Sequence, residues 1–313
     1  MTGPAILVAG GHGLLGTELA RVASSAGVLL VRASSAELDV TDPVSVASGV
    51  RRFTEAARAG NRPAVVVNAA ADTATDAAES RPDPAYRVNA EGPVNLGMAC
   101  LDHGIPLIHI SSDYVFDGRA RVPYEPYHPP NPLNVYGKSK VAGERALLDL
   151  GAPAWIVRTS WLFSAQGGNF LTTMARLERE RAEITVVDDQ TGSPTWVRDL
   201  ASGLLALAGR VTADDPPAGS RVLHYANAGQ TTWHGLAHAV FDALGADPSR
   251  VRPCTSEEFA RPARRPSYSV LSPRAWCEAG LPPPPPWRSA LTAALAANGP
   301  GEVVDQERTF LSR

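Results

Sequence analysis

The chain has 313 residues, a hydrophobic fraction of 44% and a formal charge of −3. This length suffices for one large α/β domain with a smaller appendage, and a charge spread without a basic face argues against a nucleic-acid or membrane-surface partner. Cys100, Cys254 and Cys277 lie far apart without CxxC spacing, so neither a disulfide framework nor a zinc site is expected.

Nothing in the sequence reads as a targeting or membrane segment. Met1 leads directly into an apolar run with no basic region or cleavage site, and no stretch approaches membrane-spanning length. We therefore expect a cytoplasmic protein whose partners are small molecules.

The first half alternates short β-branched runs with helix-like segments, which is typical of a doubly wound parallel sheet. The expected strands cover residues 6–9, 28–31, 65–68, 107–110, 155–157 and 184–187. The expected crossover helices cover residues 14–26, 43–59, 84–103 and 135–150. Six strands with intervening helices predict a Rossmann-type α/β fold.

The pattern changes after residue 188, where proline-rich joints separate short helices expected at 233–244 and 289–297. We predict three parts: an NAD(P)-binding Rossmann domain, a smaller interleaved C-terminal substrate-binding lobe, and a polar, flexible tail. Their expected bounds are 1–188 with a helix at 191–208 returning to the domain, then 209–297, then 298–313.

A glycine-rich turn follows the first expected strand and opens the first helix. Such a turn lets a pyrophosphate approach bare backbone at a helix N-terminus, where unpaired N–H groups and the helix dipole favour an anion. The context predicts dinucleotide binding more strongly than the glycines alone, which often serve only packing. The candidate cofactor residues here are Gly10, Gly13, Leu14, Leu15 and Gly16.

The second strand is expected to end at Val31, followed by Arg32 rather than an acid that would hold a ribose 2′-hydroxyl. An arginine there favours a 2′-phosphate and hence NADPH, although a merely solvated arginine, and use of NADH, stay open. Asp39 could lie beside the adenine or cap the helix beginning at Pro43. Further cofactor candidates are Ser34, Val40, Asn68, Ala69 and Ala70.

Tyr136 and Lys140 lie four residues apart near the start of an expected helix and so share one face. Reduction of a ketone needs a proton donor, and a neighbouring ammonium would lower the tyrosine pKa toward the working range. Of 29 basic residues only Lys138 and Lys140 are lysines, which a surface pair explains poorly. We predict that Tyr136 and Lys140 form a catalytic pair that also contacts the cofactor.

Two serines close the fourth expected strand at the carboxyl edge of the sheet, where ligands bind in open α/β folds. Either Ser111 or Ser112 could hydrogen-bond a substrate carbonyl, or serve only as a loop cap. The resemblance that follows favours Ser112.

Six ordered segments together resemble the dTDP-4-dehydrorhamnose reductase family, within the extended short-chain dehydrogenase/reductase superfamily, over nearly the whole chain. They are Asn68–Ala71 with Ala77–Ser80, Ser111–Phe116, Pro132–Lys140, Val157–Trp161 with Gly168–Phe170, Asp189–Thr195, and Thr231–His234. The resemblance implies reduction of a dTDP-linked 4-keto-6-deoxysugar by NADPH.

The resemblance also implies residue roles: Ser112, Tyr136 and Lys140 form the triad, in which Ser112 replaces the usual threonine. The expected substrate residues are Asp113, Tyr114, Trp161, Asn169 and Arg265. Tyr268 stands where asparagine is common, and Arg198 falls in a stretch that is acidic in magnesium-bridged members. We therefore expect no metal, and the sequence leaves a homodimer open.

Three alternatives remain. A sugar-nucleotide dehydratase or epimerase is disfavoured, because Tyr114 follows Asp113 where dehydratases carry a glutamate. A 4-ketoreductase for another dTDP-deoxysugar of an antibiotic pathway would share the same triad. A non-catalytic NADP-binding regulatory subunit should have a damaged triad, whereas Tyr136 and Lys140 are intact here.

Overall fold

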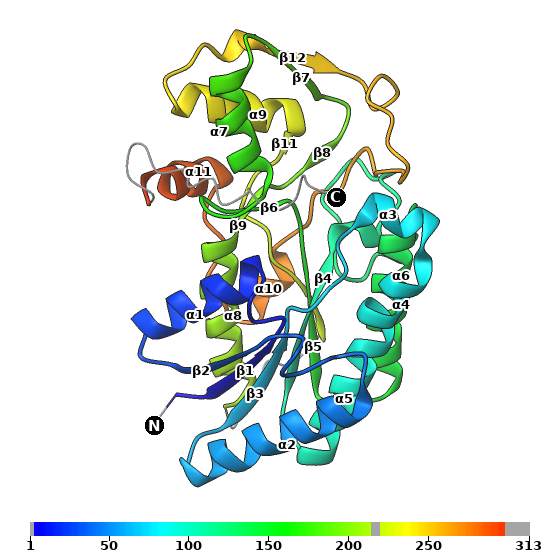
Figure 1. The fold of residues 1–313 in the computed structure, drawn as a ribbon, viewed down its shortest axis with the longest axis vertical. Coiled ribbons are helices and arrows are strands. Elements are labelled where there is room, and N and C mark those ends of the chain that lie inside the picture. The colour runs from blue at the N-terminus through cyan, green and yellow to red at the C-terminus, as the bar shows by residue number, and fades with distance from the viewer. Residues whose placement is uncertain (1–2, 214–219, 298–313) are drawn as a thin grey trace.

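The computed structural model describes residues 3–213 and 220–297. Its main sheet holds six parallel strands in the order β10-β5-β4-β3-β1-β2 (Figure 1). The strands are β1 (Ala5–Ala9), β2 (Leu29–Ala33), β3 (Ala64–Asn68), β4 (Leu107–Ser112), β5 (Ala154–Thr159) and β10 (Val222–His224). Strand order reverses between β1 and β3, so ligands are expected at the carboxyl ends there.

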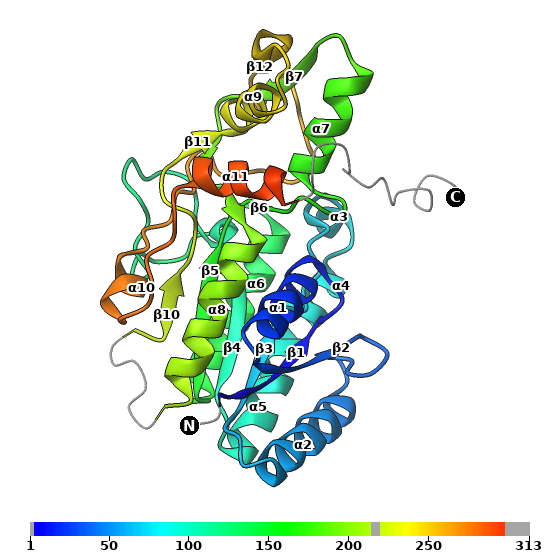
Figure 2. The ribbon, with the colours of Figure 1, turned by 90° about the vertical axis from the view of Figure 1, so that its left-hand side faces the viewer.

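Helices cover both faces of this sheet (Figures 1 and 2). One face carries α1 (Leu14–Ser25) and α8 (Val197–Val211), and the other carries α2 (Pro43–Ala59), α5 (Gly92–His103) and α6 (Val135–Asp149). Alternate residues of each strand serve opposite faces: Val8 lies in the core under α1 and α8, and Leu7 in the core under α2 and α5.

A smaller lobe stands above the carboxyl edge of the sheet (Figure 2). In it β7 pairs with β12 beside α7 and α9, with further two-residue ladders β11-β8 and β6-β9 below. The elements are β6 (Leu162–Phe163), α7 (Phe170–Glu180), β7 (Ile184–Val187), β8 (Thr191–Gly192), β9 (Thr195–Trp196), β11 (Thr231–Thr232), α9 (Trp233–Ala243), β12 (Val251–Cys254), α10 (Arg274–Glu278) and α11 (Trp287–Ala296). Of these, α10 lies lower, beside β10.

Local chemistry explains where the helices begin. The Asp42 carboxylate accepts the Val44 N–H at 2.9 Å, and Pro43 occupies the first helical turn, so α2 spans the residues predicted for it. Thr232 caps α9 in the same way by accepting the Gly235 N–H at 2.9 Å.

Four sequence-based expectations need correction. Residues 184–187 were expected in the main sheet, but this strand pairs with Val251–Cys254 in the lobe, and Val222–His224 is the sixth main strand. A β-branched run identifies a strand but not its partner. The second strand continues to Ala33, so Arg32 lies within it and not after it.

The other two corrections concern helices. The one expected at 191–208 begins only at Val197, after β8 and β9, and the one expected at 84–103 is interrupted. It consists of α4 (Pro82–Tyr86), a π-helical turn at Arg87–Glu91, and α5, and is preceded by α3 (Thr75–Ser80). The π turn places the buried Asn89 amide between Asp72 and the Ser139 hydroxyl of α6. Such turns are frequent near functional sites.

The tail predicted at 298–313 lies outside the described residues. Within the described ranges, no helix is both long and apolar enough to cross a bilayer.

Candidate active site

The glycine-rich turn packs against the ends of two neighbouring strands. Gly10 has φ +72°, and a Cβ there would lie 2.6 Å from the Ala70 backbone nitrogen. A Cβ on Gly11 would lie 2.7 Å from Cβ of Arg32. Only glycine fits at these two positions, and the turn is thereby placed beside Ala69-Ala70 and Arg32.

The N-terminus of α1 is left free for a ligand. Its N-cap, Gly13, has extended backbone and provides no side-chain cap, and the first turn from Leu14 and Leu15 carries no acid. A Cβ on Gly16 would lie 2.5 Å from Cα of Gly11, so the helix starts tight against the turn. Uncapped N–H groups at a helix N-terminus fit a pyrophosphate.

The turn after β2 carries a carboxylate, Glu37, that the sequence-based predictions did not include. Arg32 is exposed, as expected of a side chain that meets a ligand phosphate. Ser34, however, donates both its N–H (2.9 Å) and its hydroxyl (2.7 Å) to Oε2 of Glu37, and these bonds lower the Glu37 pKa. The Ser-x-x-Glu spacing of a capping box was the signal for this contact.

Asp39 fixes the next turn. Its Oδ1 accepts the Thr41 N–H at 2.9 Å and the Thr41 hydroxyl at 2.8 Å, and both bonds lower the Asp39 pKa. The alternative that Asp39 caps α2 is wrong, because Asp42 does so. Val40 is buried beside α5, where its carbonyl accepts from Asn95 Nδ2 at 2.9 Å.

Two side chains start the helix that carries the expected catalytic pair. Asn134 Oδ1 accepts the Gly137 N–H at 2.8 Å, and Glu79 Oε1 accepts the Val135 N–H at 2.7 Å. A Cβ on Gly137 would lie only 2.2 Å from the Tyr114 carbonyl oxygen. The helix start is thus held against the loop after β4.

Tyr136 meets Ser112 at this point. Burial raises the Tyr136 pKa to about 12, the Asp113 and Asp72 charges add to this, and a hydrogen bond with Ser112 opposes it. The sequence analysis expected Lys140 to lower the Tyr136 pKa, whereas burial raises it, and the Lys140 ammonium donates to the Ile110 carbonyl. Burial dominates because it removes water from around the phenolate.

Lys140 is 1% exposed and reaches the end of β4. Its Nζ donates to the Ile110 carbonyl at 2.7 Å and lies 3.5 Å from His109 Nε2. Burial lowers the Lys140 pKa to about 8, opposed by the charge of Glu144 one turn along α6. A lysine this acidic can exchange a proton near neutral pH.

Ser111 and Ser112, which end β4, and Asp113, which follows it, are all buried. Ser112 Oγ donates to Asp113 Oδ1 at 3.1 Å and accepts the Tyr114 N–H at 3.1 Å. Burial raises the Asp113 pKa to about 7, opposed by hydrogen bonds from Ser269 and Ser112. In the described part of the chain, Asp113 Oδ2 and Ser111 Oγ have no hydrogen-bond partner. Polar atoms left unpaired in a buried site indicate a place for ligand groups.

A cavity of about 1180 Å³ opens between this edge and the lobe. Tyr114 lines it, and the Tyr114 ring lies 6.0 Å from that of Tyr136, edge to face. Arg265 also lines it and holds both oxygens of Asp76, at 2.8 and 2.9 Å. Other lining groups that suit a nucleotide are the cations Arg181, Arg261 and Arg264 and the rings of Phe170, Phe259 and Trp233.

Trp161 and Asn169, two of the expected substrate residues, are not among the residues that line the cavity. Trp161, at φ +47°, stacks on Trp233 with ring centroids 3.6 Å apart, so it supports an aromatic wall of the cavity. Asn169 caps α7 instead: its Oδ1 accepts from Leu171 and its Nδ2 donates to the Gly167 carbonyl. The structure does not bring Asn169 to the cavity, because its amide is committed to this cap.

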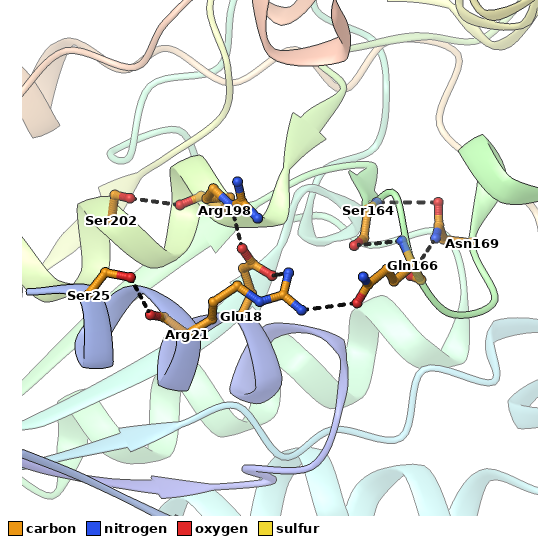
Figure 3. A network of polar contacts seen from close by, with 8 residues as sticks. All are labelled: Glu18, Arg21, Ser25, Ser164, Gln166, Asn169, Arg198 and Ser202. Carbon is orange, nitrogen blue, oxygen red and sulfur yellow. Dashed lines mark hydrogen bonds and ion pairs between the residues drawn. The ribbon is translucent and has the colours of Figure 1, made fainter. Parts of the chain in front are cut away.

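Figure 3 shows a polar network that ties the cofactor helix to its surroundings. Glu18 of α1 accepts from Arg198 of α8 at 2.6 Å and from Arg21 at 3.2 Å, and Arg21 donates to Gln166 at 3.0 Å. Arg198, singled out from the sequence as a departure, therefore carries an ion pair with α1.

Comparison with known proteins agrees with this geometry. The family model described as "RmlD substrate binding domain" matches residues 4–299. A dTDP-4-dehydrorhamnose reductase of Streptomyces griseus is 48% identical over 94% of each chain. The chain belongs to the dTDP-4-dehydrorhamnose reductase family. This confirms the resemblance seen in the motifs, and with it the expected Rossmann-type oxidoreductase.

Two further relatives are a reductase named for a different sugar and a solved structure. A dTDP-4-keto-6-deoxy-D-glucose reductase of Streptomyces niveus is 43% identical over 92% of this chain and 96% of its own. The crystal structure of a Bacillus anthracis dTDP-4-dehydrorhamnose reductase in complex with NADP superposes with a TM-score of 0.84 at 33% identity, covering 93% of this chain and 98% of that one.

Proposed function

We propose that the protein reduces the 4-keto group of dTDP-4-dehydro-L-rhamnose to give dTDP-L-rhamnose, with NADPH as the reductant. Support comes from family membership and from the Bacillus anthracis relative, which was crystallised with NADP. NADPH supplies a hydride to the carbonyl carbon, and the residues of the chain hold the substrate and handle the proton.

One observation supports the proposal: the residues proposed for ketone reduction come from two contacting elements, Ser112 from the end of β4 and Tyr136 and Lys140 from the start of α6. Ser112 acts on Tyr136 by lowering its pKa against the effect of burial, and Lys140 is buried one turn further along the same helix. The Tyr114 ring connects Tyr136 to the cavity. A ketone at this junction would face a donor pair on one side and the cofactor site on the other.

Each member of the triad has a distinct task in this proposal. The Ser112 hydroxyl orients the substrate carbonyl, and the Tyr136 hydroxyl donates its proton to the oxygen as alkoxide charge develops. With a Tyr136 pKa of about 12, the phenol keeps its proton until that charge appears. Lys140 then returns a proton toward the phenolate, which its pKa of about 8 allows.

The cavity suits the dTDP part of the substrate. Arg261 and Arg264 provide positive charge for a diphosphate, on the same loop as Arg265, which is paired with Asp76. Phe170 and Trp233 offer faces on which a thymine ring can stack.

A second candidate is reduction of a different dTDP-4-keto-6-deoxysugar, favoured by the 43% identity to the Streptomyces niveus reductase. The triad is the same for both, so product analysis must separate them. A regulatory subunit without activity is disfavoured by the intact Ser112, Tyr136 and Lys140.

The test is to incubate the purified protein with NADPH and a panel of dTDP-4-keto-6-deoxysugars, with and without a 3,5-epimerase. We expect NADPH oxidation only when a ketosugar is present, with dTDP-L-rhamnose as product. An epimeric 6-deoxysugar would replace the rhamnose assignment with the second candidate. Tight NADP binding without turnover of any ketosugar would contradict a catalytic function.

A further inference from the structure

His109 is fully buried on β4 and joins two parts of the site that the sequence analysis treated separately. Its Nδ1 lies 3.1 Å from Asn68 Nδ2 at the end of β3, and its Nε2 lies 3.5 Å from Lys140 Nζ. The imidazole thus lies between the strand end that borders the glycine-rich turn and the catalytic lysine.

The tautomer of His109 follows from a chain of donors. The Ala70 N–H can only donate, and it meets Asn68 Oδ1 at 3.1 Å, so the other end of this amide is the NH₂ group. That NH₂ donates to His109 Nδ1, which must therefore carry a lone pair. Burial and the charge of Lys140 hold the His109 pKa well below its usual value, so the ring is neutral.

A neutral ring with Nδ1 unprotonated carries its proton on Nε2, facing Lys140. We propose that His109 is a positioning residue of the reaction, held by Asn68 as the Nε2–H tautomer so that it presents a donor, not an acceptor, to the Lys140 amine. This inference rests on the proposed catalytic role of Lys140. A donor facing an ammonium disfavours the charged form and so makes Lys140 a better acid toward the Tyr136 phenolate.

The other charges around Lys140 do not provide this effect. Glu144 on α6 raises the Lys140 pKa, and Arg158 of β5 pairs with that carboxylate at 2.6 Å. Tyr136 shares the helix, and Asp72 and Asp113 act on Tyr136. Apart from burial, the donor on His109 is the feature of the described site that favours the neutral amine.

His224 provides a matched internal control. It is equally buried, but its Nδ1 lies 3.0 Å from the Tyr124 carbonyl, which can only accept, and its Nε2 lies 3.4 Å from an Arg158 nitrogen, which can only donate. His224 must therefore be the Nδ1–H tautomer. Two buried histidines of one protein should show opposite tautomers.

The first test is a long-range ¹H–¹⁵N spectrum of the ¹⁵N-labelled protein between pH 6 and 9. The seven histidines are assigned by single substitutions, including His109→Phe. We expect a neutral Nε2–H ring for His109 and a neutral Nδ1–H ring for His224, neither titrating in this range. An Nδ1–H or doubly protonated His109 would overturn the proposal, whatever the activity.

The second test uses Asn68→Asp, which keeps an oxygen for the Ala70 N–H but replaces the amide donor with an acceptor. His109 should switch to Nδ1–H, its Nε2 should accept from the Lys140 ammonium, and the falling alkaline limb of kcat should move up by about one pH unit. A switched tautomer with an unmoved limb would overturn the tuning role while leaving the proposed function intact. Conversely, a fully active Lys140→Arg enzyme would refute the catalytic role of Lys140 but not the tautomer.

Discussion

Lys140 is one of two lysines in a chain that uses arginine for its other 27 basic residues, and the two lysines differ sharply in environment. Lys140 is 1% exposed and donates to the Ile110 carbonyl, whereas Lys138 is exposed. We expect Lys140→Arg to lower kcat by roughly two orders of magnitude, about 2.7 kcal/mol of barrier. A forked guanidinium cannot take the place of one compact ammonium in this buried space.

Steady-state kinetics of Lys140→Arg, with Lys138→Arg as the matched control, check this expectation. Lys138→Arg should be nearly silent, and thermal unfolding shows whether each variant is folded. Tyr136→Phe should cost at least as much as Lys140→Arg, and the double variant much less than the sum, because the pair acts as a unit. Full activity of folded Lys140→Arg would remove the lysine from the mechanism.

We expect cofactor choice to depend on two opposing charges, Arg32 in β2 and Glu37 in the turn after it. Arg32→Ala should lower kcat/KM for NADPH relative to NADH about ten-fold or more, since a charged contact to a phosphate contributes roughly 1.5–3 kcal/mol. Glu37 acts the other way, because its carboxylate occupies the Ser34 donors that a 2′-phosphate could use. Glu37→Gln should therefore raise the NADPH preference roughly five-fold, as expected for one exposed charge.

Measuring kcat/KM with both cofactors for the unaltered enzyme and the two variants decides this point. Equal use of NADPH and NADH by the unaltered enzyme, unchanged by Arg32→Ala, would make Arg32 a solvated surface residue. A lower NADPH preference in Glu37→Gln would contradict the competition at Ser34.

At the scale of elements, the start of α6 sets the position of the catalytic hydroxyl. A methyl group at Gly137 would lie 2.2 Å from the Tyr114 carbonyl, so Gly137→Ala must push the helix start away from the loop after β4. We expect kcat to fall roughly ten- to a hundred-fold, as for a displacement approaching 1 Å at a reacting group.

Gly209 of α8 is the control for Gly137→Ala. It is exposed, and a Cβ there would have no atom within 4 Å. Gly209→Ala should leave kcat unchanged and stabilise the protein by about 0.5–1 kcal/mol, as expected for a helical glycine. If both alanines leave kcat unchanged, the close approach at Tyr114 does not position Tyr136.

The elements also show what sequence patterns could and could not predict. Residues 43–59 were predicted as one helix because its pattern and the starting Pro43 are local signals, although the cap is Asp42 and not Asp39. The partner of β7 was missed because pairing is decided by tertiary contacts. The cap that Asn169 forms on α7 was not foreseen, because a cap and a ligand contact use the same amide. The link from Asn68 through His109 to Lys140 joins three elements and has no sequence signature.

At the scale of the whole molecule, the site depends on joining the Rossmann sheet to the lobe. The network of Figure 3 links α1 to α8 and, through Arg21, to Gln166 in the loop before α7. Leu14, at the first turn of α1, is also close to Gly167 of that loop, where a Cβ would lie 3.9 Å from Leu14 Cδ1. A ligand at the α1 N-terminus would therefore lie near the loop that leads into the cavity wall.

The buried Asp113 carboxyl makes the stability of the molecule depend on pH. Its pKa is raised from 3.8 to about 7, so between these values the folded protein holds a proton that the unfolded chain has lost. Stability from this group is present below pH 4, falls as the pH rises through this window, and is fully lost above pH 7. Asp113→Asn keeps the shape of the side chain but cannot ionise.

We therefore expect the free energy of unfolding of Asp113→Asn, minus that of the unaltered protein, to increase from pH 4 to pH 7 and then to level off. Denaturant titrations at several pH values in this range measure the difference. Ser111→Ala, next to the same strand end and without a titrating group, should give a flat difference. A flat difference for Asp113→Asn would mean that its carboxyl ionises as freely in the folded protein as in the unfolded chain, and a decreasing one that the site stabilises the carboxylate.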